Sequence, residues 1–179
     1  MSVSKIDGIG TRKDGAGGES INTSVHPKKI IRMIGFCADS SAAVTYTKGD
    51  AVALQIASAT VNGANILTSF GVGNVVKLAT ETTELLCVGV VAETATATYN
   101  SASAKGSEVI VQVQVSGVFE NANVTTSSCV GLQLFPSATD GRLVLDAGSD
   151  PDTNKPLAIA LENATSNAAD IILLNPLSY

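Results

Sequence analysis

"EVIVQVQVSG", residues 108–117, carries the clearest strand pattern in the chain. Val111, Val113 and Val115 alternate with two glutamines, and successive side chains of a strand point to opposite faces. The valines therefore share one face, and the amides of Gln112 and Gln114 share the other. We expect the valine face to be buried in a core and the glutamine face to be in water.

Similar short apolar segments recur along the chain, separated by Gly, Asn, Asp, Ser and Pro. They are KIIRMIGF (29–36), AVTYT (43–47), AVALQI (51–56), VVKLA (75–79), LLCVGVV (85–91), GLQLF (131–135), RLVLDA (142–147), LAIAL (157–161) and DIILL (170–174). This rhythm is typical of a β-sandwich or barrel, whereas residues 100–107 and 162–169 can hold at most a helical turn. With 45% hydrophobic residues but only 4% aromatic ones, the core must consist of small and β-branched side chains. We predict an all-β fold, a compact β-sandwich or barrel.

One pattern occurs twice, as CVGVVAETATA (87–97) and PLAIALENATS (156–166). Residues 74–96 align with 143–165 without a gap, which places Val75 on Val144 and Glu93 on Glu162. After a loop, SEVIVQV (107–113) matches ADIILLN (169–175). We interpret this as a duplicated strand-turn-strand unit within one domain.

Residues 1–28 differ in composition from the rest of the chain, because glycines, Ser, Thr and charged residues leave no periodic apolar face. We expect a flexible N-terminal arm over 1–28 and one β-rich domain over 29–179. The first twenty residues lack the apolar stretch of a signal peptide, and no apolar run is long enough to span a bilayer. We therefore expect neither export nor a membrane partner.

Charge is unevenly distributed in a chain whose net charge is −5. Residues 1–50 hold seven basic and five acidic residues, a balance of +2, whereas the remainder holds four basic and eleven acidic, a balance of −7. Such a body repels nucleic acid. An acidic partner surface would therefore be bound by the N-terminal segment.

Few residues suggest catalysis or metal binding. His26, the only histidine, lies in the arm, where a general base has no desolvated setting. Cys37, Cys87 and Cys129 are widely spaced and predicted to be reduced, partly buried thiols. Asp150 begins a stretch, DPDTNKP, that lacks the Gly and Glu of a helix-loop-helix calcium site, which leaves a polar turn or an irregular ion site. We predict no cofactor and no metal.

Glu93 and Glu162 end the two equivalent apolar runs. The structural interpretation is that each glutamate ends a strand where the chain leaves the core. The alternative is a pair of carboxylates of the glycosidase kind, which requires the two groups within about 10 Å of each other and one of them desolvated. The flanking Ala and Thr residues provide no such pocket, so we expect a structural role and no enzymatic activity.

The order of segments over residues 48–177 resembles the small capsid decoration, or cement, proteins of tailed bacteriophages. The resemblance is carried by GDAVAL (49–54), CVGVVAETA (87–95), GSEVIVQVQVSGVF (106–119), GLQLFPSATDGRLVLDA (131–147), LAIALENATSN (157–167) and IILLNP (171–176). Residues 1–28 lie outside it, and residues 55–74 form a longer insertion than the resemblance leads us to expect. It implies a non-enzymatic virion protein, made in the host cytoplasm, that binds the major capsid protein on the outer capsid surface as an oligomer, with a trimer favoured. The alternative is a β-rich receptor-binding or fibre module of a virion.

The arm and the basic stretch after it are the predicted contact element. Apolar anchors alternate there with positive charges that would meet an acidic capsid surface or the acidic body of a neighbouring copy. An extended segment of this kind can also add a strand to an exposed sheet edge. The predicted capsid or neighbour contacts are Ile21, Val25, Lys28, Lys29, Ile30 and Arg32. A tail without any function is the alternative.

Overall fold

The computed structural model describes residues 27–38, 42–57, 60–61, 64–71, 73–80, 86–102, 107–137, 139–145 and 156–174. Their strands are β1 (Lys29–Phe36), β2 (Val44–Tyr46), β3 (Ala51–Leu54), β4 (Thr60–Val61), β5 (Ala64–Asn65), β6 (Val76–Leu78), β7 (Cys87–Val91), β8 (Ala95–Ala97), β9 (Glu108–Asn123), β10 (Gln133–Pro136), β11 (Leu143–Leu145), β12 (Ala158–Ala160) and β13 (Ala168–Leu173). The helix among the described residues is α1 (Ile66–Phe70). The predicted all-β class is confirmed.

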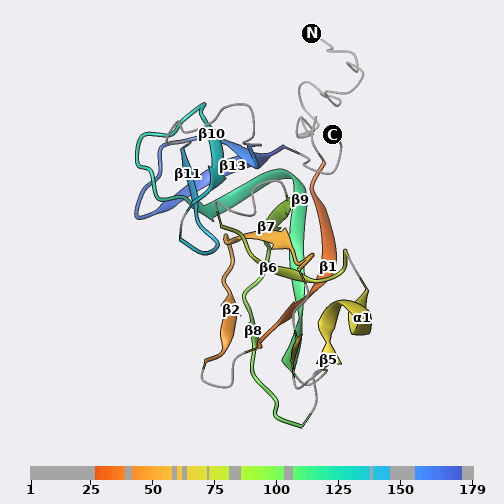
Figure 1. The fold of residues 1–179 in the computed structure, drawn as a ribbon. Helices are drawn as coiled ribbons and strands as arrows, with labels where there is room; N and C mark the ends of the chain where they lie inside the picture. The colour runs from red at the N-terminus through yellow and green to blue at the C-terminus, as the bar shows by residue number, and fades with distance from the viewer. Residues whose placement is uncertain are drawn as a thin grey trace, which may run out of the picture.

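Strand β9 connects two small barrels (Figure 1). Its first half, residues 108–116, pairs with β1 and β7, and its second half, 117–123, pairs with β13. The pairing with β1 shifts register where Lys29 faces Ser116 and Ile30 faces Gln114, and Gly117 then adopts a positive φ of 87°. A bulge followed by such a glycine bends a strand strongly. One long strand can therefore serve two barrels.

The first barrel consists of β1, β3, β6, β7 and residues 108–116 of β9. Its antiparallel order is β1-β9-β7-β3-β6. A parallel bridge between Ile34 and Val75 returns the last strand to β1 and closes the ring, supported by a hydrogen bond from Ile34 N to Asn74 O (2.9 Å). The β2–β8 ribbon extends from this barrel, and Tyr46 of β2 reaches back to cover its core.

The second barrel consists of residues 117–123 of β9 with β10, β11, β12 and β13. Its antiparallel order is β9-β13-β12-β10-β11, and a parallel bridge between Val124 and Leu143 closes it. The second half of β9 therefore takes the place that β1 has in the first barrel. Strands β10, β11, β12 and β13 take the places of β3, β6, β7 and the first half of β9.

Two tight turns, residues 47–50 and 129–132, repeat the same backbone hydrogen bonds in the two barrels. Each turn leads into the second strand of its barrel and is bonded to the end of the fourth strand. The bonds of the first turn are Gly49 N to Val91 O (3.0 Å) and Val91 N to Asp50 O (2.8 Å), and those of the second are Gly131 N to Ala160 O (2.8 Å) and Ala160 N to Leu132 O (3.0 Å).

The structure supports the duplication but corrects part of the alignment. The offset of 69 holds at the β7 and β12 positions, because Val90 and Ile159 have equivalent partners on both sides. It is wrong before them: β3 pairs Leu54 with Val76, and β10 pairs Pro136 with Leu143, so Val75 does not correspond to Val144. A two-residue difference in loop length causes this shift, which keeps every side chain on its face and is therefore invisible in an apolar pattern.

The alignment of the last strands is also wrong, by four residues. Val113 pairs with Val91 in the first barrel, and Ile171 pairs with Ala160 in the second. Gln112 and Asp170 are therefore equivalent, whereas the sequence alignment places Glu108 on Asp170. The reason is again an even shift, which preserves the alternation of faces.

The two barrels pack through small side chains. Strand β7 is buried along its whole length, and β3 is buried at its first three residues. Val52, Val88 and Val91 point into the first core, whereas Ala51, Ala53, Cys87 and Val90 belong to the core of the second barrel. These outward-facing side chains of the first barrel are covered by the second, which explains why so many are Ala, Cys and Val.

Burial agrees with the predicted alternation in β9 except at Gln114. The three valines of the opening stretch are at most 3% exposed. Gln114, predicted to lie in water, is buried. Its side-chain amide donates to Ser116 O (3.1 Å) and to Val118 O (2.8 Å), so it spans the bend of the strand. The glutamine is buried because the bend folds the following residues over it.

Candidate functional site

The predicted contact residues that the structure describes lie on one exposed strand. Lys28, Lys29, Ile30 and Arg32 are all exposed, at the start of β1. Ile21 and Val25 lie outside the described residues, as does most of the predicted arm. The structure therefore brings together the basic part of the predicted contact element.

Strand β1 and the first half of β9 share an outward face. Ile30 pairs with Gln114, Arg32 with Gln112, and Ile34 with Ile110, which places these six side chains in one double row. Ile30 and Ile110 are 42% and 57% exposed. The face therefore offers large apolar side chains flanked by the positive charges of Lys28, Lys29 and Arg32. Ile110 was not predicted, although it lies two residues before Gln112 and hence on the face expected to be in water.

Among the residues that the structure describes, nothing pairs with one edge of β1 in its first half. On one side the whole strand pairs with β9, and on the other the described residues provide the bridge at Ile34 and none before it. Unpaired N–H and C=O groups at such an edge can bind an extended segment of another chain. Residues 29–33 thus combine an open backbone edge with an exposed apolar side chain and three cations nearby.

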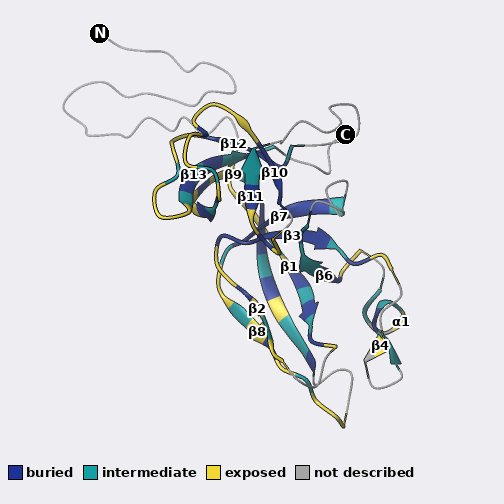
Figure 2. Ribbon diagram, turned by 60° about the vertical axis from the view of Figure 1, so that its left-hand side comes forward, coloured by how far each residue is buried: buried dark blue, intermediate teal, exposed yellow. Residues whose placement is uncertain are grey.

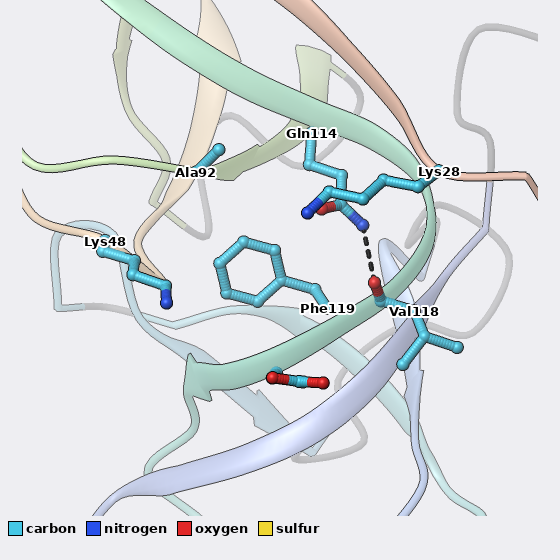
Figure 3. A pocket seen from close by; sticks show the side chains of 7 residues that line it. Lys28, Lys48, Ala92, Gln114, Val118 and Phe119 are labelled. Atoms are coloured by element: carbon cyan, nitrogen blue, oxygen red, sulfur yellow. Dashed lines mark hydrogen bonds between the residues drawn. The ribbon is translucent and has the colours of Figure 1, made fainter.

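A pocket of about 260 Å³ lies at the bend of β9 (Figure 3). Lys28 and Lys48 extend over it from opposite sides, and the ring of Phe119 lies between them. Gln114, Val118, Glu120 and Ala92 complete the lining. Because Lys48 belongs to the 47–50 turn and Phe119 belongs to the second barrel, the pocket lies where the two barrels meet.

Gln114 contributes an unsatisfied acceptor to this pocket. Its Nε2 is used by the bend of β9, while its buried Oε1 has no hydrogen-bond partner among the described residues. A buried acceptor without a donor costs about 1–3 kcal/mol. The wall of the pocket thus contains one buried acceptor without a partner among the described residues.

Asp50 fixes the junction of the barrels. Its Oδ1 accepts a hydrogen bond from Asn123 Nδ2, and its Oδ2 accepts one from Thr47 N (2.8 Å). Gly141 packs against it so closely that a Cβ there would lie 2.9 Å from Asp50 Cβ. Burial raises the pKa of Asp50 above its usual 3.8, opposed by these hydrogen bonds and by Arg142. The carboxylate thus links the first barrel to Asn123 of the second barrel, although burial disfavours its charged form.

Glu93 and Glu162 occupy equivalent exposed positions in different barrels. Glu93 Oε2 accepts a hydrogen bond from Gln112 Nε2 (2.6 Å), and Glu162 Oε1 accepts one from Asp170 N (3.2 Å). Gln112 and Asp170 are the equivalent residues of the neighbouring strands. Each glutamate thus accepts a hydrogen bond from the same position of the adjacent strand.

None of the three cysteines, predicted to be reduced and partly buried, forms a disulfide, and all three are buried. Cys129 Sγ donates to Glu162 O (3.3 Å), which ties the 129–132 turn to the end of β12. Within the described ranges, no group of three or more His, Cys, Asp or Glu side chains could hold a metal ion. His26, Asp150 and the rest of DPDTN lie outside those ranges.

Two further features bear on the alternatives. Tyr46 is buried and Tyr99 packs against the first core, so neither contributes to an exposed aromatic patch. Among the residues with described structure, no helix has the length and apolarity needed to cross a bilayer.

No family model, curated protein or solved structure matches the chain.

Proposed function

We propose that this protein is a non-enzymatic virion component that decorates and stabilises the outer surface of a phage capsid, bound to the major capsid protein as an oligomer. The proposal starts from the sequence resemblance over residues 48–177. Its support from the structure is an all-β body of two barrels in which the described polar side chains serve mainly the fold, such as Asp50, Glu93 and Asn163.

The observation that carries the proposal is the open, basic and apolar edge of β1. Lys28, Lys29 and Arg32 provide three positive charges around the exposed Ile30. This surface is suited to an acidic protein partner that presents an extended segment, either a capsid subunit or a neighbouring copy. A shell offers many equivalent sites, so modest contacts per copy suffice when copies are linked in an oligomer.

Co-sedimentation with empty capsids tests the proposal. Lys28→Glu/Lys29→Glu should bind more weakly than the natural protein, and the binding that remains should depend less on salt, because fewer ion pairs form with the acidic partner. Lys77→Glu provides a matched control, since Lys77 lies on β6, away from the start of β1. Deletion of residues 1–24 should also weaken binding while leaving the body folded. Equal capsid occupancy by all four proteins would contradict the proposal.

The second candidate, a receptor-binding or fibre module, predicts that the protein lies at an appendage of the particle rather than over the capsid surface. The absence of an exposed aromatic patch around Tyr46 and Tyr99 gives it less support.

A further inference from the structure

The large exposed apolar side chains of the described residues fall mainly into two groups. They are 42–57% exposed and comprise Ile30, Ile110 and Val118 beside β1 and β9, Val130, Leu132 and Leu161 on the second barrel, and Ile56 elsewhere. The first group is the surface described above. The second group lies on the second barrel, and we call it the turn patch.

The turn patch is continuous over one end of the second barrel. Gly131 N donates to Ala160 O and Ala160 N donates to Leu132 O, which places Val130 and Leu132 beside Leu161. The loops at this end, near β12 and β13, are largely exposed (Figure 2). Leu132 also borders a shallow depression lined by Gly131, Gln133, Phe135 and Leu145.

The duplication shows what covers the equivalent surface in the first barrel. There the 47–50 turn meets the second half of β9: Asn123 N donates to Gly49 O (3.0 Å), and a Cβ on Gly49 would lie 2.8 Å from Asn121 O. The first turn carries the exposed Lys48 and the buried Asp50 where the turn patch carries Val130 and Leu132. A Cβ on Gly131 would meet nothing within 4 Å, so the second turn is open where the first is filled.

The strand that fills the first turn is the initial strand of the next barrel. Residues 117–123 of β9 hold that place in the second barrel, and β1 holds it in the first. The equivalent occupant of the turn patch is therefore β1 of a second copy. Met33 and Ile34 hold the places of Ala122 and Asn123, but Ile34 N already donates to Asn74 O (2.9 Å). The contact therefore falls on residues 29–33, whose outer edge pairs with no described strand and which carry the exposed Ile30.

Charge also favours this pairing. Lys28, Lys29 and Arg32 surround Ile30, whereas the exposed Glu162 follows Leu161 in the turn patch. Opposite charges at the rim guide two surfaces into register, while apolar side chains at the centre supply most of the affinity.

We propose that copies of this chain associate head to tail, with the turn patch of one copy bound to the start of β1 of the next. Because such a contact uses two different surfaces, repeated copies form a closed ring when the rotation between neighbours permits it. Otherwise they form an open chain of copies. The inference rests on the oligomer of the proposed function and not on capsid attachment.

Light scattering on isolated full-length variants tests the contact. Ile30→Glu disables one surface and Leu132→Glu the other, and both positions are exposed enough to accept a charge. Each variant alone should be a monomer at concentrations where the natural protein is an oligomer, because a charge at the centre of an apolar contact raises the dissociation constant by about tenfold or more. Ile56→Glu, an equally exposed position outside both surfaces, should keep the natural mass.

Mixing the variants provides the sharper result. Ile30→Glu retains an intact turn patch and Leu132→Glu retains an intact β1, so the mixture should form a species of two chains and no larger one. A monomeric natural protein, an oligomeric Ile30→Glu or Leu132→Glu, or a mixture that stays monomeric would each overturn the inference. Far-UV circular dichroism checks folding, and Val130→Glu replaces Leu132→Glu if that variant does not fold.

The same proteins separate this inference from the proposed function. If the natural protein is a monomer that still co-sediments with capsids, the head-to-tail contact is contradicted and capsid binding is not. If it is an oligomer that does not co-sediment, capsid binding is contradicted and the head-to-tail contact is not.

Discussion

Gly89 of β7 lies so close to Gln114 of β9 that a Cβ on the glycine would stand 2.1 Å from the Gln114 carbonyl oxygen. This close approach occurs at the bend of β9, where the two barrels separate. Ala158 is the equivalent residue of the second barrel, as its pairing with Leu134 mirrors that of Gly89 with Val52. The same strand position therefore requires glycine in one barrel and accepts a methyl group in the other.

Gly89→Ala should destabilise the protein by about 3 kcal/mol, the upper part of the range for overpacking, because the obstacle is backbone and cannot rotate away. The reciprocal change, Ala158→Gly, should cost only about 1 kcal/mol, from backbone entropy and one lost methyl group. Urea denaturation of both variants measures the difference. Equal losses would show that the close approach to Gln114 does not constrain β7.

The caps of the two equivalent turns predict unequal effects. Asn163 Oδ1 accepts hydrogen bonds from Cys129 N (3.0 Å) and Val130 N (3.1 Å), whereas Thr94 Oγ1, its counterpart, accepts one from Lys48 N (3.0 Å). Asn163→Ala should therefore lower the free energy of unfolding by about 2 kcal/mol and Thr94→Ala by about 1 kcal/mol. Thermal unfolding of the two variants provides the comparison, and a larger loss for Thr94→Ala would contradict the assigned caps.

Asp50 predicts a pH dependence of stability. Burial raises the pKa of this carboxyl in the folded protein above its unfolded value of 3.8. The protonated form is therefore favoured by folding, and the associated stability is present below pH 3.8 and lost as the pH rises through the folded pKa. The free energy of unfolding of the natural protein, relative to that of Asp50→Asn, should therefore be highest at low pH and should decrease as the pH rises.

Denaturant unfolding of the natural protein and Asp50→Asn between about pH 3 and about pH 7 measures this difference. Comparison with the variant removes the contributions of all other carboxylates. A stability difference that grows with pH would show that the hydrogen bonds from Asn123 and Thr47 outweigh burial.

The paired glutamates are predicted to be structural. Replacing Glu93 and Glu162 together by Gln should leave particle assembly unchanged and cost at most about 1 kcal/mol of stability, since both side chains are exposed and the amide oxygen can still accept a hydrogen bond. Unfolding measurements and particle assembly check the first expectation. Loss of a glycan-cleaving activity in the double variant would establish the catalytic alternative.

Much of this fold follows from local pattern. Every apolar segment identified in the sequence contains a strand, from β1 to β13, because short strands of alternating or continuous apolar residues between turn residues are encoded locally. The repeat of Glu93 at Glu162 indicated the duplication. The errors of two and four residues in the alignment of the two repeats could not be detected from the sequence. An even shift leaves the same side chains on the apolar face of a strand.

Other features depend on contacts that no local pattern contains. The burial of Gln114 results from the bend at Gly117, and the role of Gly89 results from a backbone 25 positions away in the chain, at Gln114. The helix α1 lies within residues 55–74, a stretch of Ser, Thr, Asn and Gly whose structure the sequence left open. Of the site, the exposed basic residues of β1 were predicted, whereas the turn patch becomes visible only when the two barrels are compared.

The proposed function places this protein on the outside of a capsid. Electron cryo-microscopy of purified particles that carry the protein tests it most directly, because the two barrels joined by the bent β9 have a recognisable outline. The account predicts density for this body at many equivalent positions over the outer capsid surface, with the start of β1 against a capsid subunit or a neighbouring copy. Density confined to a tail or fibre, or a capsid surface without this body, would contradict it.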